Sequence, residues 1–183
     1  MEFETESLFI RKVERSEQDM LMQLLTSEGA DRFFSRHDID LQAYSNTFIK
    51  GKRRSKKQRA SRFRRGYNQG YGVFEKSSGK MVGIIRFNFF AETGRVLIGR
   101  MIHPDFRRRG FASQLDIPIM RFIRDKHGID EFSMYVKSDN VASNQRVQKN
   151  SVFELVETVD TGIVGPGTTE TIKINRYDYA LSE

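Results

Sequence analysis

The chain has 183 residues, which suits one domain with a hydrophobic core, and 38% of its residues are apolar. It contains no cysteine, which excludes disulfide bonds, cysteine zinc ligands and a cysteine nucleophile. The net charge of +7 is unevenly spread: residues 50–65 hold ten Lys or Arg and no acid, which leaves 21 of the 31 basic residues against 24 acidic ones elsewhere.

The N-terminal sequence lacks the basic start and apolar run of a signal peptide. No apolar stretch approaches the roughly 18 residues that a membrane span needs. We therefore expect a cytoplasmic protein that makes no membrane contact.

The first elements are expected to be one strand and two helices. Residues 7–13 read as a strand, and a helix is expected to start at Ser16 with Asp19 as its capping-box partner. Leu41, Tyr44 and Phe48 fall on one helical face, which predicts a second helix from about 40 to 49. The basic insertion or loop, residues 50–66, follows directly.

The middle of the chain predicts a hairpin, a strand and a long helix. Two apolar runs flank a turn at 77–79, and a strand over 95–103 is expected to end at Pro104. The helix is expected from Gly110 to about Lys126, with Pro118 kinking it or removing a hydrogen bond.

The last part predicts a strand over 132–137, a short helix starting near Asn140, and strands over about 154–160 and 171–180. The order of elements indicates one mixed α/β domain over residues 1–183.

The segment most informative about chemistry is 102–115, with the sequence IHPDFRRRGFASQL. A strand ends there, a basic turn with a glycine follows, and an amphipathic helix begins. Such a junction binds anions, because the first N–H groups of a helix are unpaired and its dipole favours negative charge. Gly110 allows the backbone to approach a phosphate closely. Neither a Walker A motif nor a Rossmann fingerprint is present.

Here the sequence resembles a known family. Residues 107–112, RRRGFA, match the Q/R-x-x-G-x-G/A signature of the GNAT acetyltransferase superfamily. Asn140, Ser143 and Lys149 are similar to the N-x-x-S…K pattern of its RimJ/RimL-like branch. The resemblance implies a GNAT-like fold, with a central mixed, mostly antiparallel sheet of about seven strands flanked by about four helices. It also implies an N-acetyltransferase that moves an acetyl group from acetyl-CoA to an amine.

The resemblance further implies which residues hold the cofactor. The backbone of the 101–102 strand end is expected to pair with the pantetheine arm, and backbone N–H groups of the turn to hold the pyrophosphate. Asn140 is expected near the thioester, although a helix N-cap explains it equally well. The expected cofactor-binding residues are Met101, Ile102, Arg107, Arg108, Arg109, Gly110, Phe111, Ala112 and Asn140.

The sequence differs from many family members at the position of the residue that acts as general acid. Many superfamily members carry a Tyr seven residues after the Asn, and this chain has Val147. Ser143 is the candidate substitute acid, and Asn140 is expected to be catalytic with it. The base is not assigned: His103, Glu92 and Glu154 are candidates. No metal site is expected.

The basic insertion points to the acceptor. Its charge would repel cationic amines and favour an acceptor that is anionic or attached to something anionic, such as a protein terminus on a ribosome or aminoacyl-tRNA. Phe63, Tyr67 and Tyr71 lie among or next to its arginines, as in stacking surfaces for nucleic acid, although core packing explains Tyr71 equally well. The expected partner-binding residues are Arg53, Arg54, Lys56, Lys57, Arg62, Arg64 and Arg65.

Three alternatives remain open from the sequence. The insertion is also compatible with a solvated loop. The chain is also compatible with a catalytically weak GNAT-fold module that binds RNA, or with an acetyltransferase for small-molecule amines. A monomer and a homodimer are equally compatible with the sequence.

Overall fold

A computed structural model describes residues 2–30, 40–49, 67–90, 93–149, 152–165 and 168–180. The strands are β1 (Phe3–Glu4), β2 (Leu8–Arg11), β3 (Tyr67–Glu75), β4 (Met81–Phe90), β5 (Arg95–Ile102), β6 (Glu131–Lys137), β7 (Glu154–Gly165) and β8 (Thr168–Ala180). The helices are α1 (Gln18–Leu25), α2 (Leu41–Ser45), α4 (Phe111–His127) and α5 (Val141–Lys149), with 3-10 turns η1 (Arg15–Glu17) and η3 (Pro104–Phe106).

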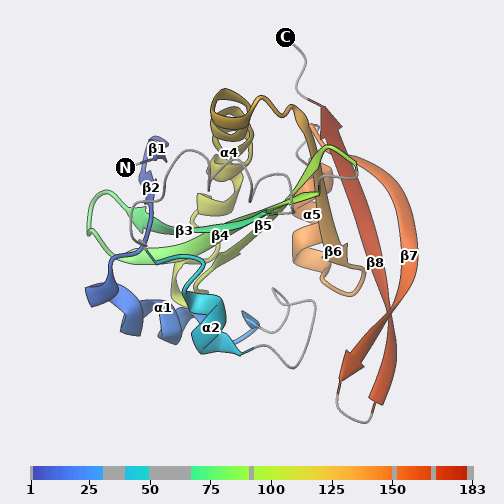
Figure 1. Cartoon of the computed structure of the whole chain (residues 1–183), viewed down its shortest axis with the longest axis horizontal. Helices are drawn as coiled ribbons and strands as arrows, with labels where there is room; N and C mark the ends of the chain where they lie inside the picture. The colour runs from blue at the N-terminus through green and yellow to red at the C-terminus, as the bar shows by residue number, and fades with distance from the viewer. Residues whose placement is uncertain are drawn as a thin grey trace.

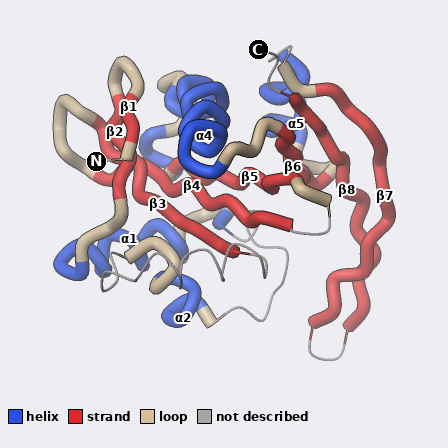
Figure 2. Tube along the Cα trace, turned by 45° about the horizontal axis from the view of Figure 1, so that its top comes forward, coloured by secondary structure: helices blue, strands red, loops and turns tan. Residues whose placement is uncertain are grey.

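The eight strands of the described chain form one sheet in the order β1-β2-β3-β4-β5-β6-β8-β7. Every neighbouring pair is antiparallel except β5 and β6. α1 and α2 lie against one face and α4 against the other, while β7 and β8 form a long hairpin that extends beyond the rest of the sheet (Figures 1 and 2). The mixed, mostly antiparallel α/β fold predicted from the sequence is confirmed, with one strand more than the seven expected.

Two apolar clusters hold the layers together. The larger cluster lies between the sheet and α4, whose buried Phe111, Leu115, Ile119 and Ile123 repeat every four residues and so share one helical face. The smaller one packs α1 and Phe48 against the opposite face of the sheet. Because the side chains of a strand alternate between faces, β4 and β5 contribute to both clusters.

The predicted boundaries hold for the elements from β3 to α5 and shift toward both ends of the chain. The helix expected from about 40 to 49 is wrong in its second half: α2 ends at Ser45, and the Phe48 carbonyl accepts from the Val13 backbone N–H at 3.1 Å, next to a bridge between Val13 and Ile49. The first helix does not begin at a Ser16 cap. The 3-10 turn η1 precedes it, with Glu14 as N-cap and the Glu17 carboxylate accepting from the Glu14 backbone N–H at 2.9 Å. α4 continues through Pro118 to a left-handed Gly128. Among the described residues, no helix is long and apolar enough to cross a membrane.

Candidate active site

The strands β5 and β6 separate after a short paired segment. Their parallel pairing joins Val96 to Phe132 and Leu97 to Ser133, and in the described chain it goes no further, although both strands continue. We call the region beyond these pairs the splay. The carboxyl-terminal half of β5 is paired with β4 on one side. Its other side is therefore open to an extended ligand that can pair with a strand edge.

The turn that follows β5 is anchored by side chains. The His103 Nδ1 accepts from the Asp105 backbone N–H at 3.3 Å and caps η3. The Arg107 guanidinium donates to the Ile102 carbonyl at 3.2 Å and to the Glu28 carbonyl at 2.8 Å. Arg107 therefore ties the turn to the end of β5 and to the loop after α1. His103 has a structural role as a cap, and its assignment as a base remains a prediction.

The segment 107–112, here called the anion turn, leaves its backbone donors free. Arg108 has φ of 63° and Gly110 has φ of 77°, so a non-glycine residue adopts the left-handed conformation next to a glycine that does the same. The N–H groups of residues 108–112 have no hydrogen-bond acceptor among the described residues. Several adjacent unpaired N–H groups at the start of α4 form the kind of cradle that binds phosphate.

The three arginines of the anion turn differ in their partners. Arg109 pairs with the nearly buried Glu75 carboxylate, and its guanidinium lies 4.7 Å from the centre of the Phe111 ring. A hydrogen bond from Ser78, with Arg109 adding to it, holds the pKa of Glu75 below its usual value. Arg108 is exposed and has no side-chain partner in the described chain. Arg108 therefore offers the least compensated positive charge of the three.

The start of α5 brings together the residues of the second motif. The Asn140 side chain accepts from the Ser143 backbone N–H at 3.3 Å, so Asn140 caps the helix as the sequence suggested. The Ser143 hydroxyl is half-buried and has no hydrogen-bond partner among the described residues. It is therefore free to act on a ligand. Val147, at the family's Tyr position, is fully buried in the core.

Asn144 is a positioning residue that the sequence reading missed. Its side-chain amide donates to the Lys137 carbonyl at 2.9 Å and to the Asn140 carbonyl at 3.0 Å. Its oxygen accepts from Asn175 at 2.9 Å and from the Tyr177 hydroxyl at 2.8 Å. These bonds hold α5 against β6 and β8. In the sequence, Asn144 is visible only as a second Asn four residues after Asn140, and this spacing alone does not indicate which groups Asn144 would contact.

A buried charged cluster, also missed from the sequence, lies beside the splay. The Asp116 carboxylate in α4 pairs with Arg100 from β5, and with Arg146 from α5 at 2.9 Å. Asp116 is 1% exposed. We call these three residues the Arg–Asp–Arg cluster. The one hint of this cluster in the sequence is Asp116 itself, an acid that lies next to the apolar positions 115 and 119 of an amphipathic helix.

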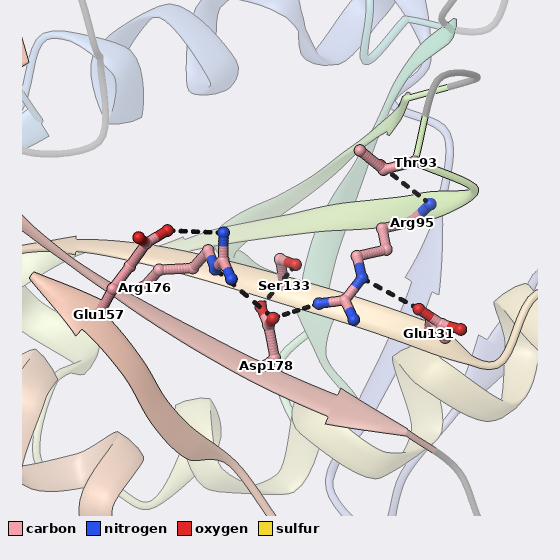
Figure 3. A network of polar contacts seen from close by, with 7 residues as sticks. All are labelled: Thr93, Arg95, Glu131, Ser133, Glu157, Arg176 and Asp178. Atoms are coloured by element: carbon pink, nitrogen blue, oxygen red, sulfur yellow. Dashed lines mark hydrogen bonds and ion pairs between the residues drawn. The ribbon is translucent and has the colours of Figure 1, made fainter. Parts of the chain in front are cut away.

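A second polar network lies on the opposite face of the sheet. Phe132 and Met134 of β6 belong to the core cluster that packs against α4, so Ser133 between them faces the other side. The Asp178 carboxylate accepts from the Ser133 hydroxyl at 2.8 Å and pairs with both Arg95 and Arg176, as Figure 3 shows. Glu131 and Glu157 pair with the outer sides of these two arginines. Among the described residues, this network holds three acids and two bases, an excess of one negative charge.

The remaining predicted residues either fall outside the described chain or have other roles. Glu92 and the partner-binding set Arg53, Arg54, Lys56, Lys57, Arg62, Arg64 and Arg65 lie outside the described residues, as does Phe63. Tyr71 is buried, and its ring stacks on Phe87 at 5.7 Å, so it belongs to the core and presents no surface to bases. Glu154 is exposed at the start of β7. Where the structure describes the chain, no three His, Asp or Glu side chains gather as metal ligands.

Comparison with known proteins identifies the fold. A family model described as an acetyltransferase (GNAT) domain matches residues 7–151. The structure superposes on an acetyltransferase from Salmonella typhimurium that modifies the N-terminal serine of ribosomal protein L7/L12, with a TM-score of 0.72, 19% identity and 97% of each chain covered. No curated protein sequence matches the chain.

Two further structures were solved with coenzyme A. A RimL ribosomal L7/L12 α-N-protein acetyltransferase superposes with a TM-score of 0.69 and 19% identity, over 97% of this chain and 96% of that one. A spermidine N-acetyltransferase from Vibrio cholerae, solved with CoA and spermine, superposes with a TM-score of 0.65 and 11% identity over 95% of each chain. Since the family model covers most of the sequence, the chain belongs to the GNAT acetyltransferase family and is an N-acetyltransferase that uses acetyl-CoA.

Proposed function

We propose that this enzyme acetylates the amino terminus of a protein, or an amine carried by an anionic partner such as a ribosome or a tRNA. The observation that carries the proposal is the separation of charge along the chain. Ten cations and no acid lie in residues 50–65, while the rest of the sequence is slightly acidic. The charge of this segment would attract a polyanion and repel free polyamines. The fold shared with RimL enzymes supports the same reading.

The described residues fit acetyl-CoA at the anion turn and the splay. The free N–H groups of residues 108–112 and the uncompensated Arg108 suit a pyrophosphate. The edge of β5 beyond its pairing with β6 suits an amide-containing arm, which would share the Ile102 carbonyl with Arg107. When bound, acetyl-CoA supplies an acetyl group activated as a thioester.

The acceptor amine would approach from the face that carries Asp178. The net negative charge there favours a cationic amine, whose proton must be lost before it attacks. Binding both reactants in one geometry supplies a large part of the rate. The Ser143 hydroxyl, which has no protein partner among the described residues, would protonate the departing sulfur.

The proposal is tested by offering two acceptor classes in competition. Purified enzyme is given acetyl-CoA with an equimolar mixture of dissociated ribosomal proteins and spermine, and the products are identified by mass spectrometry. We expect acetylation of protein α-amines, with spermine left unmodified. Acetyl-spermine as the sole product would contradict the proposed acceptor.

One observation in the structure bears on the alternative that the protein is an RNA-binding module without catalytic activity. Val147 occupies the family's Tyr position and is fully buried, so that position supplies no acid. With the basic insertion, this favours a GNAT-fold module that binds RNA. Such a module would show tight, salt-sensitive RNA binding and no acetyl transfer to any acceptor.

A further inference from the structure

The Arg–Asp–Arg cluster joins three elements that surround the splay. Arg100 belongs to the part of β5 beyond its pairing with β6, Asp116 to α4 and Arg146 to α5. Both guanidinium groups also contact the sulfur of Met134 on β6, at 3.7 Å and 3.8 Å. The cluster therefore spans from one strand of the splay to the other, on the side of the sheet that packs against α4.

The cluster contains two positive side chains and one negative side chain, so its own net charge is +1. Two guanidiniums share one carboxylate. Arg100 and Asp116 are nearly fully buried, with side-chain exposures of 6% and 0%, whereas Arg146 is partly exposed at 21%. Burial lowers the pKa of Arg100, an effect that Asp116 opposes, but a guanidinium keeps its proton in proteins. Among the described residues the second positive charge has no acid of its own, and a single neutral pair would be enough for structural cross-linking alone.

Arg100 also has a donor that the protein leaves unused. Its Nε lies buried and without a hydrogen-bond partner in the described chain. This donor therefore adds no compensation for the Arg100 charge within the described chain. The splay, where the acyl-carrying arm of acetyl-CoA is expected, adjoins this residue.

The position of Arg146 adds a chemical reason. It directly precedes Val147, the position at which many related enzymes carry the Tyr that protonates the departing sulfur. The candidate acid Ser143 is a weak one, because an alkyl hydroxyl gives up its proton reluctantly. Negative charge would therefore persist on the sulfur unless a nearby cation lowers its energy.

We propose that the Arg–Asp–Arg cluster stabilises the thiolate that leaves acetyl-CoA, with Arg100 and Arg146 supplying the charge and Asp116 positioning both. In this step the amine nitrogen forms a bond to the thioester carbonyl carbon and the carbon–sulfur bond breaks. The electron pair of that bond stays on the sulfur while the bond breaks. The Ser143 hydroxyl then protonates the thiolate, and the proton released by the amine returns to Ser143 through water. The inference rests on the proposed placement of acetyl-CoA in the splay.

The test measures the ionisation of the CoA thiol in the binary complex, without acceptor. The ultraviolet absorbance of the thiolate is followed against pH for free CoA and for CoA bound to the wild-type enzyme. Titrations with Arg146→Gln and Arg146→Lys follow, and circular dichroism and the Kd for CoA confirm that each variant is folded and loaded. We expect the thiol to ionise at least one pH unit lower when bound to the wild type than when free.

The variants separate charge from packing. Arg146→Gln should move the ionisation of the bound thiol upward by about one pH unit and Arg146→Lys should keep it low. Asp116→Asn, which raises the net charge of the cluster, should lower it further. A purely structural cross-link would shift none of these titrations.

The results of this titration distinguish a failure of the thiolate inference from a failure of the proposed function. A bound wild-type thiol that ionises at the same pH as free CoA would overturn this inference alone, whatever the variants do. Failure of the wild type to bind CoA would overturn the proposed function and this inference together. Acetylation of spermine in place of protein would change the acceptor and leave the thiolate result unaffected.

Discussion

The side-chain oxygen of Asn144 accepts a hydrogen bond from the hydroxyl of Tyr177 at 2.8 Å, in the interior of the protein. The bond joins α5, which begins with the predicted catalytic motif, to the strand β8 near the C-terminus. Asn144 also donates to three backbone carbonyls around the start of α5. The end of this helix that carries the predicted catalytic residues is therefore held by Asn144, for which no catalytic role is predicted.

Removing the Asn144 side chain should destabilise the protein more than removing the hydroxyl of Tyr177. Asn144→Ala leaves buried carbonyls and the Tyr177 hydroxyl unpaired, and we expect a loss of about 2–3 kcal/mol in the free energy of unfolding. Tyr177→Phe removes one bond, and we expect a loss of about 1 kcal/mol. Denaturant titration measures both values. Equal losses for the two variants would show that the backbone contacts of Asn144 contribute little.

A glycine substitution in the anion turn should impair CoA binding. Gly110→Ala places a Cβ where a phosphate is expected, and its φ of 77° disfavours alanine. We expect a loss of about 1 kcal/mol in stability and a rise of about tenfold in the Kd for CoA, measured by isothermal titration calorimetry.

Gly79→Ala is the matched control. Its φ is 67°, a Cβ there likewise meets no atom within 4 Å, and it lies in the turn between β3 and β4. It should lose similar stability and leave the affinity for CoA unchanged. A similar loss of affinity in both variants would point to backbone strain and away from a phosphate site at Gly110.

Loss of the Ser143 hydroxyl should reduce turnover with little effect on folding. The hydroxyl makes no hydrogen bond within the described chain, so Ser143→Ala should change the melting temperature little. We expect kcat to fall about a hundredfold if the hydroxyl protonates the departing sulfur, with the KM for acetyl-CoA unchanged. Steady-state kinetics decide this, and an unaltered kcat would remove Ser143 from the mechanism.

Neutralising part of the basic insertion should weaken acceptor binding alone. Replacing Arg53, Arg54, Lys56 and Lys57 with Ser should lower kcat/KM for the protein acceptor about tenfold at low salt, and less at high salt, because screening weakens attraction in the wild type too. The affinity for CoA should not change.

A charge-matched control removes four exposed cations elsewhere, at Arg15, Lys80, Arg121 and Lys173. It should leave acceptor kinetics close to those of the wild type. Equal effects of the two quadruple variants would show that net charge matters, and that the location of the basic insertion does not.

The buried Lys12 should make stability depend on pH. Its ammonium group donates to the Thr47 carbonyl at 2.9 Å and the Gly70 carbonyl at 2.5 Å, and burial lowers its pKa to about 8. Between this value and the ordinary lysine pKa the unfolded chain binds more protons than the folded one, so stability rises with pH there.

Lys12→Met removes this titration. The free energy of unfolding of the wild type relative to the variant should therefore rise by about 2 kcal/mol between pH 7 and pH 9.5. Urea titrations at a series of pH values measure the difference. A difference that stays constant over this range would contradict the lowered pKa.

The sequence predicted those parts of the fold that depend on local pattern. The amphipathic face of α4 and the turn at 77–79 were evident, because helical periodicity and turn residues act over a few positions. The two-residue β1 was missed because it is too short to show a pattern. The last two strands run further into the glycine-rich turn than expected, since their pairing with each other continues to Gly165 and Thr168.

The site was predictable where one continuous segment forms it. The anion turn was found because its arginines and Gly110 are adjacent in the sequence. The Arg–Asp–Arg cluster was not, because Arg100, Asp116 and Arg146 lie on three elements that only the fold brings together. The network around Asp178 was not predicted either, because its partners come from three strands, β5, β6 and β8, that are distant in the sequence.

The most direct test of the central claim is the transfer of labelled acetyl from acetyl-CoA into a fractionated cell extract, with protein, RNA and small-molecule pools counted separately. The account predicts label in the protein pool, or in amines carried by RNA, and its loss when Arg53, Arg54, Lys56 and Lys57 are replaced by Ser. Label confined to small molecules would contradict the proposed acceptor. Label in no pool, with acetyl-CoA still bound, would contradict catalysis and favour the RNA-binding module.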